Sequence, residues 1–523
     1  MKNNSFVKQA AILAAATLFV RFIGFLYRLP LTHIIGDEGI GLYSVGYQFY
    51  LFMLVMSSAG LPNAISKMVS ERVARREYRN AHGVFKAAMV IAVIFGATGS
   101  LLLWFFAGHF EIWFNHPGSA YAIRALSPTV LIVAVMAVYR GYFQGMNNAA
   151  PTALSQVVEQ IFKAIFSVWI AFLFIDQIER AAAGGTAGTG IGALLGLLTL
   201  LAIYKFASPK LHKRIRNDRT KEIEKPGKAA KEVLSTAFPI IFGAAIYSMA
   251  NFVDMAMIPS RLAASGEFTM EQSRVLFGQF SGKFVVLTTL PVAVSSALAA
   301  AVLPSIAGSN VTHDYKSVAE KIRKALRIST FISIPAAVGL GVMARPILLL
   351  LFPAFPEGAI LLQVGAVSVV FLSLNQIATG ALQGIGKIMI PVFGAIIGVL
   401  FKIPINYVLI ARPEINVVGA VISTCVCYFL ASGFNMIALK KYSKVKIDWI
   451  GIFIKPASGA AVMGMTCFIA YYVLMAVTFG HNGISTLTSV GLGVVMYFLM
   501  MVLFGAIHEE DMKRIPLVRR LIK

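Results

Sequence analysis

Seven basic residues lie inside segments of the sequence that are otherwise apolar enough for a lipid environment. Two of them, Arg124 and Lys455, lie near segment ends and can snorkel to the interface, which leaves five. The first two are seven residues apart in the stretch LFVRFIGFLYR, so on a helix both side chains point to the same side. Charged groups at membrane depth are costly, and by default they face the interior of the protein and serve its function. For Arg28 and Lys283, which lie nearer the outer surface, snorkelling to the interface is the alternative. The five residues are Arg21, Arg28, Lys163, Lys283 and Lys402.

A polar stripe surrounds one of these residues. Gln156, Glu159, Gln160 and Lys163 follow one another at spacings of three and four in the sequence, which places them on one face of a helix. Glu159 and Lys163 can form an ion pair at this spacing. The stripe is either a self-contained contact between helices or the lining of a cavity in which Glu159 modulates the cation.

Lys163 and Lys402 occupy matching places in an internal repeat. The segments GYFQGMNNAAPTALSQVVEQIFK (141–163) and GALQGIGKIMIPVFGAIIGVLFK (380–402) share Gly-x-x-Gln-Gly at the start and Phe-Lys at the end, at a constant offset of 239 residues. Chance similarity between two apolar stretches is the alternative. A parallel repeat is an architecture of membrane transporters, in which the substrate binds between the two halves.

The composition indicates a membrane protein. Of the 523 residues, 58% are hydrophobic and 13% are charged, whereas a soluble domain carries about 25% charged residues. The apolar residues occur in runs of about 20 or more, the length of a membrane-spanning helix. We therefore predict an all-α polytopic membrane protein with fourteen spans, at residues 6–35, 39–66, 84–107, 120–140, 151–175, 187–206, 233–259, 276–303, 328–352, 359–382, 389–410, 416–439, 451–477 and 484–506.

Basic residues gather on alternate connections between these spans. With the N-terminus in the cytoplasm, 34 of the 46 Lys and Arg residues fall in cytoplasmic segments and five in outer loops. Because cytoplasmic loops are the basic ones, this asymmetry places both termini in the cytoplasm. The net charge of +23 is therefore mostly a signal of topology, and no nucleic-acid partner is expected.

Together these features resemble the MOP exporter superfamily, and most closely its SpoVB/YtgP/MurJ-like branch of lipid-linked oligosaccharide flippases. The resemblance rests on the span count, the cationic first helix FVRFIGFLYRLPL and the stretch LPVAVSSALAAAVLPSIAGS, and it covers residues 1 to about 508. It implies two pseudo-symmetric six-helix lobes and two further helices that form a groove for a lipid tail. The expected boundaries are 1–208 for the first lobe, 209–232 for a basic cytoplasmic linker, 233–440 for the second lobe, 441–508 for the last two helices and 509–523 for a cytoplasmic tail.

The resemblance also implies a substrate and the residues that bind it. The family's usual substrates are lipid II and related undecaprenyl-diphosphate sugars, which a single chain moves across the bacterial plasma membrane by alternating access through a cationic cavity. A bare diphosphate cannot cross about 30 Å of hydrocarbon, whereas Arg binds it as a two-pronged donor and Lys as a point charge. The expected ligands are Arg21, Arg28, Lys163, Lys283 and Lys402, with Gln156, Glu159 and Gln160 beside them. The stretch QFYLFMLVMSSAGLPNA lacks an arginine that many relatives carry there, and Lys163 or Lys283 is expected to compensate.

Sodium is the one cofactor that the resemblance suggests. Some relatives bind it through an Asp on the seventh helix, an Asn and an Asp on the eleventh and a Thr on the twelfth. The matching residues here are Asp254, Asn406 and Thr424, while Ile410 stands in place of the second carboxylate. Oxygen ligands suit a hard cation. An ion pair between Asp254 and Arg261 is the alternative.

Other classes of function fit less well. A MATE-type exporter of cationic drugs, from the same superfamily, would need an acidic cavity, which the interior cations argue against. A membrane enzyme would need carboxylates or histidines on a long outer loop, and because the outer loops are short no catalytic residues are expected. Capsule, teichoic-acid and spore-cortex precursors carry the same diphosphate as lipid II, so the sequence leaves the glycan open.

Overall fold

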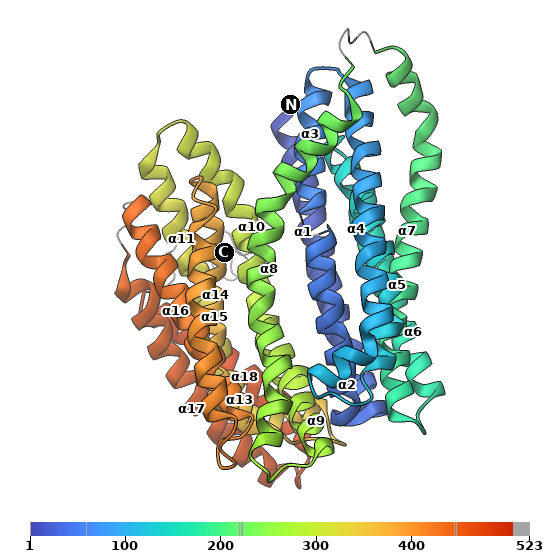
Figure 1. Ribbon diagram of the computed structural model, residues 1–523. Helices are drawn as coiled ribbons and strands as arrows, with labels where there is room; N and C mark the ends of the chain where they lie inside the picture. The colour runs from blue at the N-terminus through green and yellow to red at the C-terminus, as the bar shows by residue number, and fades with distance from the viewer. Residues whose placement is uncertain are drawn as a thin grey trace. The chain divides into compact units, whose positions relative to one another are not determined.

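All regular structure in the computed structural model is helical, for the residues it describes: 2–58, 60–218, 220, 223–443, 445 and 447–505 (Figure 1). This confirms the all-α class that the composition predicts. The elements, of which η1 and η2 are short π-helices, are α1 (Lys2–Leu26), α2 (Arg28–Ser58), α3 (Leu61–Ala74), α4 (Tyr78–Trp113), α5 (Ala120–Gly145), α6 (Ala150–Leu173), α7 (Ile178–Arg216), α8 (Pro226–Ala264), α9 (Met270–Gly278), η1 (Gln279–Phe284), α10 (Val285–Val311), α11 (Tyr315–Val342), α12 (Ala344–Leu351), α13 (Ala359–Gly365), α14 (Ser368–Gly384), α15 (Ile390–Leu409), α16 (Val418–Ser443), η2 (Ile450–Ile454), α17 (Lys455–Val477) and α18 (Asn482–Leu503).

The chain is a multi-pass membrane protein. Within the described residues, twelve helices are long and apolar enough to cross a membrane. A thirteenth span exists if α13 and α14, which are bent by 51° relative to each other, cross as one. The first predicted span contains a shorter apolar helix, Ala15–Leu26. The fourteen predicted spans thus correspond to the twelve long helices, the bent pair and α1.

Two local features interrupt the first helices. Tyr27 separates α1 from α2, so the span predicted over residues 6–35 is divided there. Gly36 interrupts α2 with φ 64° and ψ −177°, a backbone conformation that glycine adopts readily because it has no Cβ. The acidic residues Asp37 and Glu38 follow this break directly.

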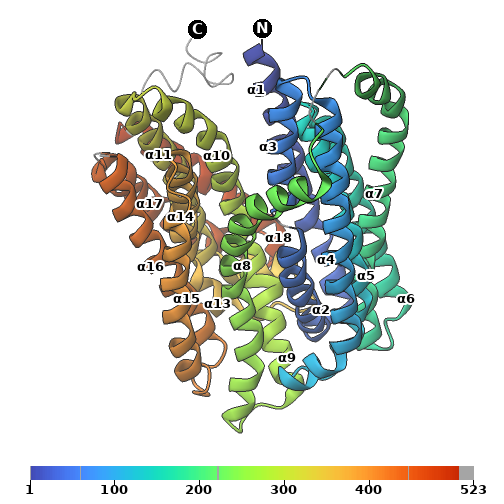
Figure 2. The ribbon, with the colours of Figure 1, turned by 45° about the horizontal axis from the view of Figure 1, so that its top comes forward.

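By packing, the chain forms two compact units. The first comprises residues 1–283 and 403–420, and the second comprises 284–402 and 421–523. In the first unit α6 packs on α7, α4 on α5 and α2 on α9. In the second unit α17 packs on α18 and α11 lies against α14 and α17 (Figure 2). The first unit takes in α8 and α9, so these units differ from the lobes expected at 1–208 and 233–440, whose boundaries stay a prediction.

Two turns of the first unit recur in the second with the same backbone geometry. Asn147, between α5 and α6, has φ 59°, and Gly386, 239 residues later between α14 and α15, has φ 82°. Arg76, between α3 and α4, has φ 65°, and His313, 237 residues later between α10 and α11, has φ 56°. In each pair of turns, three backbone hydrogen bonds match in register. The turn after α4, at Asn115 with φ 56°, has the same three bonds, so this geometry is a general way to end a helix and the internal repeat stays a prediction.

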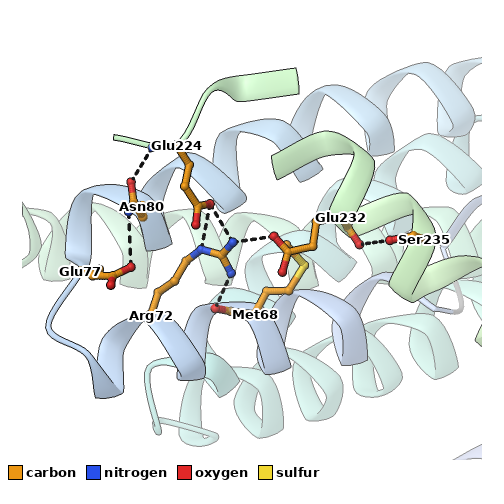
Figure 3. A network of polar contacts seen from close by, with 7 residues as sticks. All are labelled: Met68, Arg72, Glu77, Asn80, Glu224, Glu232 and Ser235. Atoms are coloured by element: carbon orange, nitrogen blue, oxygen red, sulfur yellow. Dashed lines mark hydrogen bonds and ion pairs between the residues drawn. The ribbon is translucent and has the colours of Figure 1, made fainter. Parts of the chain in front are cut away.

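A network of polar contacts ties the connection between α7 and α8 to the turn between α3 and α4 (Figure 3). Buried Arg72 binds Glu224 and Glu232, with Nη2 2.7 Å from a carboxylate oxygen of each. The Arg72 Nη1 also donates to the Met68 carbonyl at 3.1 Å. The backbone N–H of Glu224 donates to Asn80 Oδ1 at 3.0 Å. The segment that leads into α8, together with the start of α8, is therefore anchored to α3 by charged hydrogen bonds and to α4 by a neutral one.

Candidate functional site

Arg28 and Lys163 lie in one cluster with three tyrosines of the first unit. Lys163 is buried on α6, with Nζ 4.6 Å from the ring centroid of Tyr47 and 5.7 Å from that of Tyr27. The ammonium also donates to the Tyr47 hydroxyl at 3.4 Å. The Arg28 guanidinium lies 5.0 Å from the ring centroid of Tyr43, whose hydroxyl is 3.0 Å from that of Tyr27. Both cations therefore meet aromatic rings, whose negative faces stabilise positive charge.

Local sequence explains how these groups meet. Tyr27 and Arg28 lie at the junction of α1 and α2. Tyr43 and Tyr47 are four residues apart on α2 and stack with centroids 5.8 Å apart, since side chains at this spacing share a helix face. On the other side of α6, α7 presents Gly192, and a Cβ there would lie 2.9 Å from Lys163 Cβ. This close approach of α7 fixes the face of α6 that carries Lys163.

The cluster has no acidic partner in the described part of the chain. The ion pairs found there involve Arg72, Arg140, Arg274 and Lys283, and none includes Arg28 or Lys163. The Nη1 atom of Arg28 is buried and, among the described residues, has no hydrogen-bond partner. The cluster can therefore offer positive charge and unused donors to an anion.

Glu159 binds Arg140 of α5, and the predicted pair between Glu159 and Lys163 is wrong. The Oε2 atom of Glu159 is 2.7 Å from Arg140 Nη2, and Arg140 Nε donates to Ser155 at 3.0 Å. The two-pronged guanidinium can bind Glu159 and Ser155 at once, whereas Lys163 turns to the tyrosines of α2. The spacing on one helix could not reveal this partner, because Arg140 comes from a neighbouring helix.

The other two members of the polar stripe are also enclosed. Gln160 is buried, and its amide would lie 3.3 Å from a Cβ added at Gly24, where α1 meets α6. Gln156 is half-buried, and its Oε1 has no hydrogen-bond partner within the described residues. The stripe thus faces neighbouring helices, and its part in substrate binding stays a prediction.

Lys283 has a carboxylate partner that the sequence analysis did not identify. Its Nζ is 2.6 Å from Asp37 Oδ2, and the two side chains are 1% and 4% exposed. Beside them, Arg274 binds Glu38 at 2.8 Å. Both acidic residues follow the Gly36 break, and the acidic pair in the sequence is the signal that could have pointed to this contact. The charge of Lys283 is thus already matched, unlike that of Lys163.

Arg21 and Lys402 occupy different environments. Arg21 is exposed on α1, one turn before the contact between Gly24 and Gln160. Lys402 of the second unit is buried, and its Nζ donates to the Thr424 hydroxyl at 2.8 Å. Lys402 is thus enclosed in its own unit, as Lys163 is in the first. A common cavity for the two lysines stays a prediction.

The three residues matched to a sodium site fall in two units. Buried Asp254 and Asn406 lie in the first unit, where Asn406 Nδ2 donates to Asp254 Oδ1 at 3.0 Å. Thr424 belongs to the second unit. Arg261, the alternative partner of Asp254, lies 3.8 Å from the ring centroid of Tyr407 and donates to its carbonyl. Carboxylate and amide oxygens of this kind suit sodium, and the site stays a prediction.

The tyrosines are the residues that the sequence analysis missed. Tyr43, Tyr47 and Tyr50 recur at spacings of four and three in the stretch GLYSVGYQFY, which places them on one face of α2. That pattern could have marked an aromatic face. Its contact with Lys163, 116 positions away from Tyr47, could not be read from the spacing.

Comparisons with known proteins agree with this fold. The family described as polysaccharide biosynthesis protein matches residues 6–309, and the MatE family matches residues 281–408. The chain is 26% identical to the stage V sporulation protein B of Bacillus subtilis, with all of both chains covered. It is 27% identical to the lipid II flippase MurJ of the same organism, over 84% of each chain.

Solved structures show the same fold at lower identity. A lipid II flippase MurJ in an inward closed conformation superposes with a TM-score of 0.70 at 16% identity, covering 98% of this chain and all of the other. An inward-facing multidrug resistance MATE family transporter of the MOP superfamily gives a TM-score of 0.65 at 15% identity, covering 82% and 99%. The resemblance to the MOP superfamily inferred from the sequence is confirmed.

Proposed function

Because the chain belongs to the polysaccharide biosynthesis protein family, we propose that it moves an undecaprenyl-diphosphate-linked cell-wall precursor, such as lipid II, from the inner to the outer leaflet of the bacterial plasma membrane. A relative named as a lipid II flippase supports this substrate class. The relative named for sporulation adds a spore-cortex precursor as a second glycan with the same diphosphate. The relatives with a named activity are transporters, so we assign the chain no catalytic step.

The observation that carries the proposal is the pair Arg28 and Lys163. A buried lysine and a half-buried arginine without a carboxylate partner among the described residues are suited to an anion and unsuited to a cation. Arg28 can give two parallel hydrogen bonds to phosphate oxygens, and Lys163 adds a point charge. Both stay charged as the substrate moves, so together they replace the water that the diphosphate loses in the membrane.

Further residues complete the proposed path. Arg21, exposed on α1, is the first cation that a headgroup would meet, and Lys402 is the counterpart of Lys163 in the second unit. Gln156 and Gln160 are polar neighbours on α6, where Glu159 is bound to Arg140. We leave Lys283 out of the site because Asp37 already matches its charge. We propose that a single chain works by alternating access with both termini in the cytoplasm, and that Asp254 and Asn406 hold any coupling sodium.

A MATE-type exporter of cationic drugs is the second candidate. It is favoured by the MatE match over residues 281–408 and by the likeness to a MATE transporter fold. A cationic drug would be repelled by Arg28 and Lys163, which have no acidic neighbour to cancel their charge. This candidate therefore needs a different site, centred on Asp254.

The test compares two ligands on the purified full-length chain. We expect undecaprenyl diphosphate to bind, and tetraphenylphosphonium, a lipophilic cation, not to compete with it. Lys163→Met and Arg28→Gln should each weaken binding of the diphosphate lipid about tenfold or more, the loss expected for one charge-assisted contact of about 1.5–3 kcal/mol. Arg261→Gln is the matched control, because half-buried Arg261 also lies on a tyrosine ring of the first unit, but that ring, of Tyr407, is exposed. Binding of tetraphenylphosphonium alone would overturn the proposal in favour of drug export.

A further inference from the structure

Six buried or half-buried cations described in the first unit fall into two groups. Arg72, Arg140, Arg274 and Lys283 each lie within 2.8 Å of a carboxylate oxygen. Arg28 and Lys163 lie instead against the rings of Tyr27, Tyr43 and Tyr47, which we name the tyrosine cage. This division separates the cations that join helices from those that remain available to a ligand.

A tyrosine ring and a carboxylate differ in whether the N–H donors of the cation they contact stay available to a ligand. A carboxylate accepts strong hydrogen bonds from a cation and neutralises it, so an incoming phosphate must displace it. A ring face stabilises the charge without taking its N–H donors. Lys163 makes one long hydrogen bond, at 3.4 Å to the Tyr47 hydroxyl, and the buried Nη1 of Arg28 makes none to a described residue. The cage therefore leaves N–H donors of both groups free for a ligand.

We propose that Tyr27, Tyr43 and Tyr47 are positioning residues for the diphosphate, which hold Lys163 in the charged state inside the membrane and aim the free donors of Lys163 and Arg28 at it. The inference rests on the proposed function and extends it to residues that carry no charge. An isolated buried ammonium gives up its proton, since low dielectric penalises the charged form. The rings prevent this loss without supplying a competing anion.

The surroundings of Lys163 make the cage its main source of stabilisation. On α6, the nearby charged residue is Glu159, which is bound to Arg140 of α5. α7 packs on Lys163 with Gly192. From α1 and α2 the titratable and charged groups around Lys163 are Tyr27, Arg28, Tyr43, Tyr47 and Tyr50.

The experiment distinguishes the contribution of the Tyr47 ring to ligand binding from that of its hydroxyl. Binding of undecaprenyl diphosphate to the full-length protein is measured for wild type, Tyr47→Phe, Tyr47→Leu and the control Tyr204→Leu. Tyr204 is also half-buried in the first unit but packs on Phe85 and Tyr139, and no cation of the described residues lies over its ring. We expect Tyr47→Leu to weaken binding about tenfold, as for loss of a desolvated cation–π contact, and Tyr47→Phe and Tyr204→Leu to stay within about threefold.

A pH series distinguishes positioning from packing. If Lys163 loses its proton without the ring, the affinity of Tyr47→Leu relative to wild type should recover as the pH falls from 8 to 6. Using this ratio cancels the titration of the lipid itself. A ratio that is the same at both pH values, or a Tyr47→Leu protein that binds as wild type does, would overturn the cage. Failure of the wild-type protein to bind undecaprenyl diphosphate would overturn the proposed function as well as the cage. Binding by wild type with no effect of Tyr47→Leu would overturn the cage alone.

Discussion

The Glu159 carboxylate lies 2.7 Å from Arg140, which leaves Lys163, one helical turn further along α6, to the tyrosines of α2. Helix α6 thus carries Glu159, whose charge is neutralised by Arg140, and Lys163, whose charge no described carboxylate neutralises. The neutralised charge joins α6 to α5, and the other is placed to meet a ligand. This arrangement lets structural and functional roles be tested separately.

Glu159→Gln should lower the stability of the protein but leave its affinity for undecaprenyl diphosphate largely unchanged. It leaves the Arg140 guanidinium, whose side chain is 14% exposed, without its counter-charge, and we expect a loss of about 1–2 kcal/mol in stability. Affinity for undecaprenyl diphosphate should change less than about threefold, since Lys163 does not depend on Glu159. Thermal denaturation in detergent and a binding titration give the two quantities. Lost affinity at unchanged melting temperature would show that Glu159 acts on the ligand site.

Lys283→Met should be far more damaging to stability than Lys163→Met. It removes the ion-pair partner of Asp37, whose side chain is 4% exposed, and breaking a buried ion pair typically costs about 3–5 kcal/mol. The double variant Asp37→Leu/Lys283→Met should recover most of that loss, because both charges of the pair are then absent. The melting temperatures of the three proteins test this. A stable Lys283→Met protein with impaired binding would restore Lys283 to the list of ligands.

Arg72→Met should loosen the connection between α7 and α8. It removes the contacts to Glu224 and Glu232, whose side chains are 22% and 39% exposed, so we expect a cost of about 1–2 kcal/mol. Limited proteolysis should cut this connection faster in the variant. Arg75→Met, which removes an exposed arginine three residues away, is the control. Equal cleavage rates in both variants would argue that the anchor contributes nothing.

Stability should fall in mild acid through His116, which lies in the turn between α4 and α5. Burial lowers its pKa to about 4; the hydrogen bond to the Met255 carbonyl opposes this shift and the Arg274 charge adds to it. The unfolded chain, with an ordinary histidine pKa of about 6.5, takes up a proton first as the pH falls. Stability is therefore lost between about pH 6.5 and 4, by at most roughly 3 kcal/mol.

His116→Gln provides the control for this prediction. Glutamine keeps a neutral N–H donor for the Met255 carbonyl but does not titrate. Its melting temperature should fall less than that of wild type between pH 7 and pH 5. Parallel curves for the two proteins would assign the acid sensitivity to other groups.

Much of the fold could be predicted from the sequence because membrane-spanning helices are recognised by the length and hydropathy of their apolar runs. The predicted repeat could be seen in the sequence because Gly-x-x-Gln-Gly occurs before both turns. Asn147 and Gly386, which follow it, both have positive φ. The break at Tyr27 was not predicted, although Pro30 three residues later could have marked it, since a proline disrupts the helical turn before it.

The site was predicted less completely than the fold. Spacing placed Lys163 on a polar face of a helix, but it could not show which neighbouring helix would meet that face. Tertiary packing pairs Glu159 with Arg140 of α5 and Lys283 with Asp37 of α2. It also places Lys163 against Tyr47 of α2. Local periodicity identifies the face of a helix, and partners from distant segments decide what its charges do.

The central claim is that a diphosphate lipid crosses the membrane on Arg28 and Lys163. The most direct test is translocation of a fluorescent undecaprenyl-diphosphate saccharide in proteoliposomes containing the full-length chain. We predict transport by wild type and by Arg261→Gln, and loss of at least about tenfold in the Arg28→Gln/Lys163→Met double variant, which lacks both contacts. Equal transport rates in all three proteins, with equal amounts of protein inserted, would contradict the account.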